Sequence, residues 1–327
     1  MKKKIAVLLL AVSFVFVGIF IYALKAKNNF KPYAIEIKPY LYGETQNDNY
    51  VMAKISGQLP QVFEFDCEID GKTAVWVYGI SNQNDLTKLI IPNKVEIVAE
   101  PCMCSKLEEI VLGKDVWRYD VCGDNSQYSV KTFQVHTDNY EFDTLNGSLV
   151  SKDRKIIFRA IKNIDLIPNE CEEIHSYAFS HTSISLDRYS LSNIKKIRYG
   201  AFVNCDNITS VFLPENILIG GSVFADCDNL SFIYLPKSAI RWNTLDNPPF
   251  ADLSPTATVY CGNLDDYFPQ IKTWYDSWPP GYVDHLEVDS VEAFMLYWGF
   301  VDTQTIVFGQ TADDMEKAMN TGVGSLS

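Results

Sequence analysis

An offset of 22 residues relates two neighbouring stretches of this chain and limits the folds that it can adopt. Residues 201–214 read AFVNCDNITSVFLP and residues 223–236 read VFADCDNLSFIYLP, so Phe, Cys, three aliphatic positions and Pro recur in the same order. A period in the twenties with one Leu-x-x-Ile-x-Leu core per unit is typical of a leucine-rich solenoid. The repeat therefore predicts the architecture and says much less about a ligand.

The repeat continues along most of the chain as a hexad whose first, fourth and sixth positions face the core. The second, third and fifth positions then face outward across the sheet. Eight such units predict one strand per repeat of about 22 residues, stacked as a solenoid over residues 62–262. The first hexad positions are Leu86, Leu107, Val130, Ile161, His181, Ile208, Leu230 and Thr256.

Three details resemble the BspA-type leucine-rich repeats of bacterial surface proteins. An aromatic turn recurs as Ala178-Phe179, Ala201-Phe202 and Val223-Phe224, and a Cys follows the last two. Residues 64–78 are similar to the polar hairpin with which many such domains begin, and residues 145–150 (LNGSLV) resemble the hairpin that interrupts them. Asn-Gly between apolar runs is also a hairpin signal in its own right. The resemblance implies adhesion to, or capture of, macromolecules of other cells.

The N-terminus carries a targeting signal. Lys2, Lys3 and Lys4 precede residues 5–24, a run without any charged residue. Such a run is long enough to cross a hydrocarbon core of about 30 Å as a helix, and the lysines place its start in the cytoplasm. A cleaved secretory signal is the alternative. We expect a cell-surface protein that is membrane-anchored with its C-terminal part outside, or secreted if the N-terminus is cleaved.

The charge balance excludes one class of partner. The first 27 residues hold five of the 28 Lys and Arg residues and none of the 41 acidic ones, so 23 basic and 41 acidic residues remain downstream. A body this acidic repels phosphate backbones, and we expect no nucleic acid partner. Membrane contact is expected through the N-terminal helix only.

The same considerations divide the chain into four predicted segments. They are a signal anchor or signal peptide (1–27), a stalk or N-terminal cap with strands at 34–37 and 50–55 (28–61), the solenoid (62–262) and a small C-terminal α/β cap (263–327).

The sequence carries no recognisable catalytic motif. There is no Gly-x-Ser-x-Gly elbow, His-Glu-x-x-His helix or phosphate-binding glycine loop. Cys171, His175 and His181 are the nearest approach to a metal site, but they lack the paired spacing of structural zinc ligands. We expect no enzyme, no cofactor and no bound metal.

Eight cysteines lie downstream of the apolar run, and their spacing leaves the disulfide pattern open. Cys104, Cys205 and Cys227 occupy the same interior position of their units. A small apolar side chain packs there, so we expect these three to be buried thiols.

Two groups of aromatic residues are candidates for binding. Phe212, Phe232 and Tyr234 lie at outward positions of adjacent repeats, where they form either a contact patch or a stabilising cross-strand cluster. Trp274 and Trp278 lie in an aromatic segment after the repeats, where they either stack on sugars or cover the open end of the core.

Beyond that segment, the pattern predicts helices at 288–298 and 312–319 with Thr311 as an N-cap, and a strand at 305–308.

Two functional classes follow from these observations. The first is a non-enzymatic recognition or adhesion protein that binds a protein or glycan on another cell or matrix through the repeat sheet. The second is a glycan-binding accessory protein or carbohydrate-active enzyme that uses the C-terminal aromatic segment.

Overall fold

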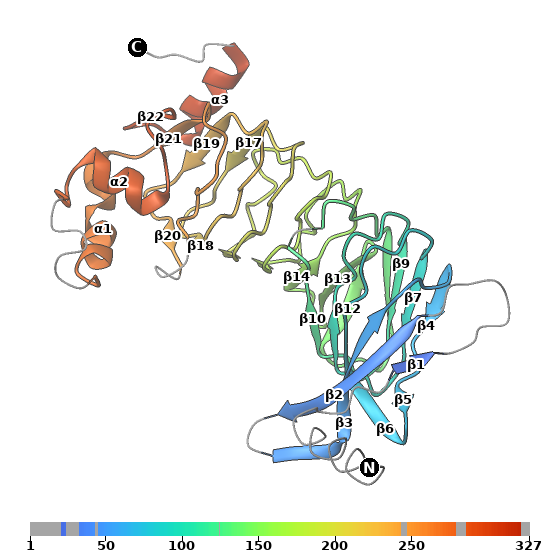
Figure 1. The fold of residues 1–327 in the computed structure, drawn as a ribbon. Helices are drawn as coiled ribbons and strands as arrows, with labels where there is room; N and C mark the ends of the chain where they lie inside the picture. Colours follow the sequence, from blue (N-terminus) through green and yellow to red (C-terminus); the bar gives the residue numbers. More distant parts are fainter. Residues whose placement is uncertain are drawn as a thin grey trace, which may run out of the picture. The chain divides into compact units, whose positions relative to one another are not determined.

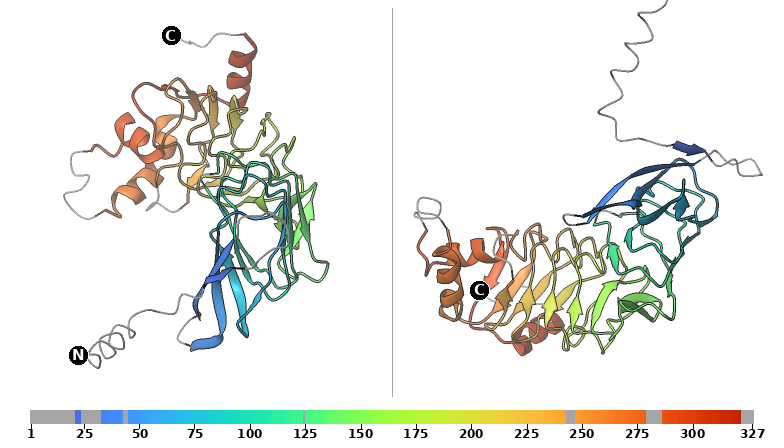
Figure 2. Two further views of the ribbon diagram at one scale, coloured as in Figure 1. Left: turned by 45° about the vertical axis from the view of Figure 1, so that its right-hand side comes forward. Right: turned by 90° about the horizontal axis from the view of Figure 1, so that it is seen from below.

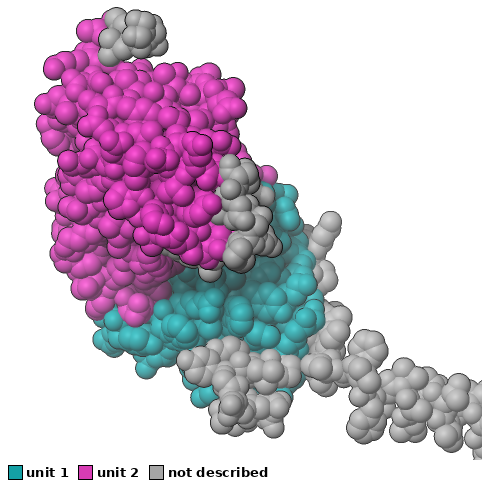
Figure 3. All heavy atoms as spheres, turned by 90° about the vertical axis from the view of Figure 1, so that its left-hand side faces the viewer, with its two compact units in different colours: residues 1–120, 135–140 teal, residues 121–134, 141–327 magenta. Residues whose placement is uncertain are grey.

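The structure, a computed structural model, describes residues 21–23, 33–42, 45–123, 125–242, 247–278 and 286–321. The chain divides into two compact units, which Figure 3 distinguishes by colour. Unit 1 comprises Met1–Asp120 and Val135–Tyr140, and unit 2 comprises Val121–Gln134 and Glu141–Ser327. The predicted solenoid, residues 62–262, therefore contributes to both units.

The first sheet of unit 1 begins with antiparallel strands and continues with parallel ones (Figure 1). The β5–β6 pair is the hairpin predicted at residues 64–78, and Asp70 and Gly71 form its turn with φ of 53° and 72°. In order across the sheet the strands are β1 (Ile21–Ala23), β2 (Ala34–Tyr42), β3 (Thr45–Ser56), β6 (Lys72–Tyr78), β8 (Ile97–Ala99) and β10 (Arg118–Asp120), with β5 (Glu68–Ile69) beside β6.

A second, parallel ladder lies in unit 1. It contains β4 (Val62–Glu64), β7 (Lys88–Ile91) and β9 (Glu109–Leu112). Alternate side chains of these strands point into the core, because successive residues of a strand face opposite sides. Phe63, Leu89 and Ile110 form one such buried row. The next repeat strand, β11 (Thr132–Val135), spans the division between the units.

The strands expected at residues 34–37 and 50–55 are confirmed as parts of β2 and β3, which are longer than expected. β3 pairs in parallel with β6, so these residues extend the sheet on its β6 side. Most of the predicted N-terminal helix, residues 5–24, lies outside the described residues. Ile21–Ala23 are extended because they hydrogen-bond to β2, so the helix prediction is wrong for these three. Among the described residues, no helix is long and apolar enough to span a membrane.

Unit 2 begins with the predicted Asn-Gly hairpin. β12 (Phe142–Leu145) and β13 (Ser148–Ser151) pair antiparallel, with Leu145 opposite Ser148. Asn146 and Gly147 both have positive φ, 52° and 81°, as a two-residue hairpin turn with the sheet's own twist requires. The extra residues of the enlarged repeat therefore form this hairpin, and the turns that follow stay in register.

Two parallel ladders, rather than one, run through unit 2 (Figures 1 and 2). The prediction of one strand per repeat is therefore wrong, because in the repeats that begin at Ile208 and Leu230 a second short strand, Leu218–Ile219 or Ile240–Arg241, follows the Pro. Ladder A contains β17 (Ser210–Phe212), β19 (Phe232–Leu235), β21 (Thr258–Cys261) and β22 (Thr305–Val307). Ladder B contains β14 (Ile156–Arg159), β15 (Glu173–Ile174), β16 (Lys196–Ile197), β18 (Leu218–Ile219) and β20 (Ile240–Arg241), and continues the hairpin.

Both ladders enclose one hydrophobic core. Ladder A contributes Val211, Ile233 and Val259, which are partners in adjacent strands. The predicted register of the repeats is thereby confirmed. Ladder B contributes an isoleucine row, in which Ile157, Ile174, Ile197 and Ile219 are successive partners and are all fully buried.

A column of phenylalanine rings connects the turns of this core. Phe179, Phe202, Phe224 and Phe250 stack nearly parallel, with successive ring centroids 5.0, 5.3 and 6.3 Å apart. Phe250 continues the column onto Phe300 at 4.9 Å. The recurring aromatic turn of the sequence is therefore the central packing element of unit 2.

Three of the predicted repeat units, the fourth, fifth and eighth, differ from expectation. No strand begins at Ile161; Ile164 and Ile167 are buried there, and Leu166 is exposed. His181 does not fill a core position. It lies in a left-handed turn with φ of 58°, as Asn204 does in the next repeat with 56°.

The fifth unit has an ordinary overall length, since Phe179 and Phe202 are 23 residues apart and Phe202 and Phe224 are 22 apart. It lacks the Cys-Asp-Asn sequence of the next two units, and Thr182 and Ser183 stand where Cys205 and Asp206 stand in the next repeat. In the eighth unit, Val259 and Cys261 face the core as predicted, but Thr256 is exposed and Ala257 is buried beside it.

The C-terminal segment contains both predicted helices and the predicted strand, together with a helix that was not predicted. Ser290 caps α2 by accepting a hydrogen bond from the N–H of Ala293 at 3.1 Å. Thr311 and Asp314 form a reciprocal cap on α3. The helices are η1 (Leu264–Tyr267), α1 (Phe268–Tyr275), α2 (Val291–Trp298) and α3 (Ala312–Thr321).

Gly299 ends α2 and lets the chain return to the core. Its φ of 86° suits glycine, and a Cβ there would lie 2.6 Å from the Cβ of Pro248. Phe294 and Trp298, both fully buried, thereby join the same core as Phe250.

Candidate binding surfaces

The structure brings together the aromatic residues predicted on the outward face of ladder A. Phe212 pairs with Tyr234 in the adjacent strand, and Phe232 pairs with Ser210. Tyr260 continues the Phe212–Tyr234 row on β21. The sequence therefore predicted correctly that these side chains share one face.

This face is covered by α3. Met315 and Ala318 of the helix are buried in one cluster with Phe212 and Tyr260, and Phe232 and Tyr234 pack against its edge. Phe212 is only 7% exposed and Tyr260 2%. A partner that contacts these rings would first have to displace α3.

Arg188, which lies on a neighbouring turn of the solenoid, holds α3 in place. Its guanidinium donates hydrogen bonds to the carboxylates of Asp313 and Glu316, two residues on α3. The same guanidinium lies 5.8 Å from the centre of the Phe212 ring. The hydrogen bonds to the two carboxylates, that of Asp313 foremost, raise the pKa of Arg188. The aromatic face and the helix are thus joined by both apolar and ionic contacts.

The two tryptophans predicted as candidates after the repeats differ in exposure. Trp274 is 5% exposed and packs edge-on against Tyr297, with the ring centroids 5.7 Å apart. Trp278 contacts Trp274 at 6.1 Å and is 38% exposed. Trp274 therefore contributes to packing, and Trp278 is the member of the pair that reaches the surface.

The outward face of ladder B carries a mixed apolar and charged surface, which we call the open face. Its first row holds Glu173, Lys196, Leu218 and Ile240, which are partners in successive strands. Ile240 at the end of that row is 48% exposed. The residues that follow these strands form a second row, in which the rings of Phe158 and His175 lie 4.9 Å apart. Phe158, His175, Arg198, Gly220 and Trp242 make up that row.

Trp242 lies at the β20 end of the open face. It is 39% exposed, and the ammonium of Lys196 lies 3.6 Å from its ring centroid. The guanidinium of Arg198 lies 6.0 Å from the same ring. Gly220 stands between Arg198 and Trp242 in the row, and a Cβ there would lie 2.8 Å from the backbone nitrogen of Tyr199 and 2.9 Å from the carbonyl carbon of Arg198. Glu173 accepts a hydrogen bond from Arg198, which fixes the guanidinium in place.

Sequence reasoning missed the open face because it predicted a single strand per repeat. A signal was present, however. Ile174, Ile197 and Ile219 each stand four positions before an aromatic turn, which begins at Ala178, Ala201 and Val223. A second apolar position at that spacing indicates a second strand that faces the core.

The cysteines have separate roles. Cys102 and Cys122 are disulfide-bonded, whereas the remaining six are buried thiols. The Cys205 thiol donates to the carbonyl of Phe179 and the Cys227 thiol to that of Phe202, both at 3.0 Å. Burial raises the pKa of Cys205 to about 12. The buried thiols predicted at residues 104, 205 and 227 are confirmed.

Within the described residues, no group of three or more His, Cys, Asp and Glu side chains is close enough to hold an ion. Cys171 lies in the core, where burial raises its pKa to about 11, so its thiol is protonated at neutral pH. His181 lies in its left-handed turn instead.

A family model for bacterial leucine-rich repeats matches part of this chain. Residues 157–251 match the BspA type Leucine rich repeat region in six copies. A leucine-rich repeat protein from Eubacterium ventriosum has 12% identity and a TM-score of 0.42, covering 70% of this chain and 76% of its own. A leucine rich cell surface protein from Faecalibacterium prausnitzii has 18% identity and a TM-score of 0.38, covering 52% of this chain and 53% of its own.

The pneumococcal vaccine antigen PcpA has 12% identity and a TM-score of 0.33, covering 89% of this chain and 99% of its own. No curated protein matches the chain. The match of residues 157–251 coincides with the ladders, the stacked phenylalanines and the buried thiols of unit 2. The chain therefore contains a BspA-type leucine-rich repeat region.

Proposed function

We propose that this protein is a non-enzymatic bacterial cell-surface protein that recognises a protein partner through the open face of ladder B. The BspA-type repeats support a repeat-based binding or adhesion role. An extended sheet built from stacked units is suited to binding macromolecules because it offers a continuous row of side chains. A membrane anchor or a cleaved signal in the N-terminal apolar residues that precede β1 remains part of this proposal.

One observation carries the choice of surface. Ladder A has its outward aromatic residues under α3, whereas Trp242 and Ile240 on ladder B are 39% and 48% exposed. Tryptophan and arginine dominate the energetics of many protein interfaces, and Trp242 lies beside Arg198 and Lys196. Exposed apolar side chains ringed by charges are typical of a contact site.

The proposal is tested by binding of the purified full chain, in mild detergent, to a panel of immobilised extracellular-matrix proteins. We expect Trp242→Ala to weaken binding to the recognised protein by about 2 kcal/mol or more, roughly thirtyfold. Tyr189→Ala is the matched control, because Tyr189 is 72% exposed and lies away from the open face. Its affinity should equal that of the unchanged protein.

Two results would contradict the proposal. One is equal affinity of the Trp242→Ala variant and the unchanged chain. The other is binding that appears only after α3 is removed, which would assign recognition to Phe212, Phe232 and Tyr234 instead. Thermal unfolding of each variant checks that a loss of binding is not a loss of folding.

The alternative, a glycan-binding or carbohydrate-active role for the segment after residue 262, has narrower support. Of its two candidate tryptophans, Trp278 reaches the surface and Trp274 is 5% exposed. A single exposed indole offers one stacking plane without a second to fix the orientation of a sugar. We propose instead that α1 and α2 cover the end of the core, since Phe294 and Trp298 pack against Phe250.

A further inference from the structure

We propose that unit 1 carries a second binding site, a groove that holds an uncharged oligosaccharide. The groove has a volume of about 570 Å³ and is lined by residues of β3 and β6, by residues that precede β8 and β10, and by Tyr140. That volume is within the range of about 300 to 1,000 Å³ that is usual for small-ligand sites. Neither the open face nor the aromatic cluster under α3 contributes to it.

The floor of the groove is built by the repeat itself. Val75, Glu96 and Trp117 stand at equivalent positions of three successive turns, each 21 residues after the last. The N–H of Glu96 donates to the carbonyl of Val75 at 2.8 Å, and the N–H of Trp117 donates to that of Glu96 at 2.9 Å. The three side chains are therefore neighbours in one row, about 4.8 Å apart.

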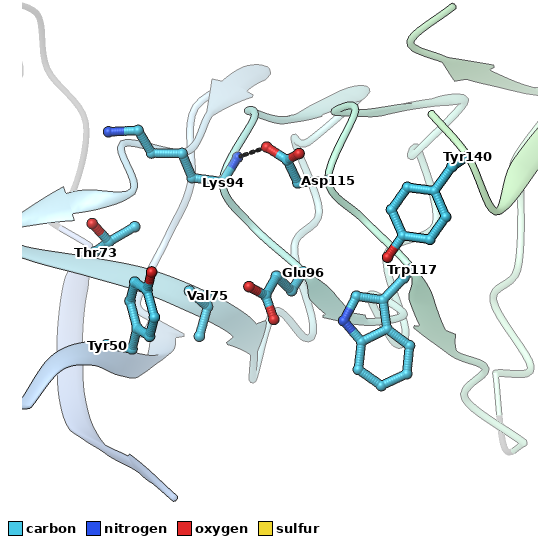
Figure 4. Close-up of a pocket in the computed structure, with 8 residues that line it drawn as sticks. All are labelled: Tyr50, Thr73, Val75, Lys94, Glu96, Asp115, Trp117 and Tyr140. Atoms are coloured by element: carbon cyan, nitrogen blue, oxygen red, sulfur yellow. Dashed lines mark hydrogen bonds between the residues drawn. The ribbon is translucent and has the colours of Figure 1, made fainter. Parts of the chain in front are cut away.

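Aromatic rings stand at both ends of this floor, as Figure 4 shows. Trp117 and Tyr140 lie together at one end, and Tyr50 stands at the other, with the carboxylate of Glu96 between them. Tyr50 is 40% exposed and Tyr140 64%. Exposed rings that face a common hollow provide flat apolar surfaces, which match the C–H faces of pyranose rings.

Buried neighbours hold the two aromatic residues at one end of the groove, Trp117 and Tyr140. Trp117 packs on Val75 and Ile97, which are buried beneath it. Tyr140 follows Asn139, whose buried side-chain amide donates to the carbonyls of Gly113 and Val116 at 2.9 and 2.8 Å. A site whose residues are fixed in advance loses little entropy when it binds.

The charges of the groove decide which sugars fit. Glu96 and Asp115 supply carboxylate oxygens that accept hydrogen bonds from sugar hydroxyls. Asp115 already accepts from the backbone N–H of Lys94 at 2.8 Å. The Lys94 ammonium is paired with Glu68 at 2.6 Å, so it does not balance the two groove carboxylates. An acidic sugar would be repelled, and an uncharged one would not.

The test is calorimetric titration of the purified full chain with cellohexaose, laminarihexaose, maltohexaose and chitohexaose, and with hexagalacturonic acid as the anionic comparison. We expect at least one uncharged hexasaccharide to bind and the anionic one to fail. Tyr140→Ala should weaken that binding about tenfold through loss of a stacking plane. Tyr189→Ala is the control tyrosine, and Tyr50→Ala is a second variant that removes a ring from the opposite end.

Failure of this proposal is distinguishable from failure of the open-face proposal. Trp242→Ala should leave sugar binding unchanged, and Tyr140→Ala should leave binding to matrix proteins unchanged. The glycan proposal is overturned if no uncharged hexasaccharide binds at millimolar concentration, or if the anionic sugar binds more tightly. It is also overturned if Tyr140→Ala and Tyr50→Ala both retain the original affinity.

Discussion

The two ladders of unit 2 are built from the same repeats but present different surfaces. Ladder A places Phe212, Phe232 and Tyr234 outward, and α3 covers them. Ladder B places Lys196, Arg198 and Trp242 outward, and the tryptophan remains 39% exposed. A row of aromatic residues on a repeat sheet is therefore insufficient to identify a binding surface. What a later part of the chain lays over that row decides its role.

The largest expected effect comes from breaking the core that both ladders share. Phe202 is fully buried between the rings of Phe179 and Phe224. We expect Phe202→Ala to lower the free energy of unfolding by about 3 to 5 kcal/mol, because it removes a large side chain and leaves a cavity. Denaturant unfolding followed by circular dichroism measures this change. If ladders A and B unfolded in separate transitions in this variant, the single core would be wrong.

The covered and open faces should respond differently to truncation of an apolar side chain. Met315 on α3 is fully buried against ladder A, whereas Ile240 on ladder B is 48% exposed. We expect Met315→Ala to cost about 2 to 3 kcal/mol of unfolding free energy, and Ile240→Ala to stay within about 0.5 kcal/mol. Equal losses in urea titrations of the two variants would show that the faces do not differ in this way.

The buried thiol of Cys205, in the core between the two ladders, should make the stability depend on pH. The thiol of Cys205 has its pKa raised to about 12 by burial, above the ordinary value of 9.0. Its contribution to stability is fully present below about pH 9 and is lost as the pH rises toward 12, because the unfolded chain ionises first. We expect the free energy of unfolding to fall with rising pH in both proteins, but less steeply in Cys205→Ala than in the unchanged chain. The difference between the two slopes should be about 1.4 kcal/mol per pH unit across that window. Parallel curves would indicate that this thiol is accessible to water in the folded state.

The smallest effect is expected for the ionic fastening of α3. Arg188→Gln removes the hydrogen bonds to Asp313 and Glu316 but leaves the apolar contacts of Met315. We expect a small decrease in Tm at low salt that shrinks as the salt concentration rises, since exposed ion pairs are screened. A decrease that does not depend on salt would mean that Arg188 acts through its packing on Phe212.

The sequence predicted the parts of the fold that repeat and missed those that depend on packing across the chain. The offset of 22 residues identified the register of Val211 with Ile233, and the Asn-Gly pair identified its hairpin. The second strand of each turn is only two residues long in several repeats, which is too short to give a period of its own. His181 was misplaced because its unit lacks the Cys-Asp-Asn sequence that marks the turn in the next two units, and His181 takes the left-handed position that Asn204 has in the next repeat.

The candidate sites were predicted less well, and for a different reason. Sequence spacing shows which side chains share a face, as it did for Phe212 and Tyr234. It cannot show that α3, a segment about 80 residues further along, packs on that face. The groove of unit 1 escaped notice because Tyr50 and Tyr140 reach it from outside the regular positions of the repeat.

Side-chain footprinting with hydroxyl radicals tests the contrast between the two faces most directly. It would compare the full chain with a chain that ends at Gln310 and so lacks α3. The account predicts that Trp242 is oxidised equally in both, and that Phe212 and Tyr260 are protected in the full chain and oxidised once α3 is absent. Oxidation of Phe212 and Tyr260 in the full chain, or protection of Trp242, would contradict it.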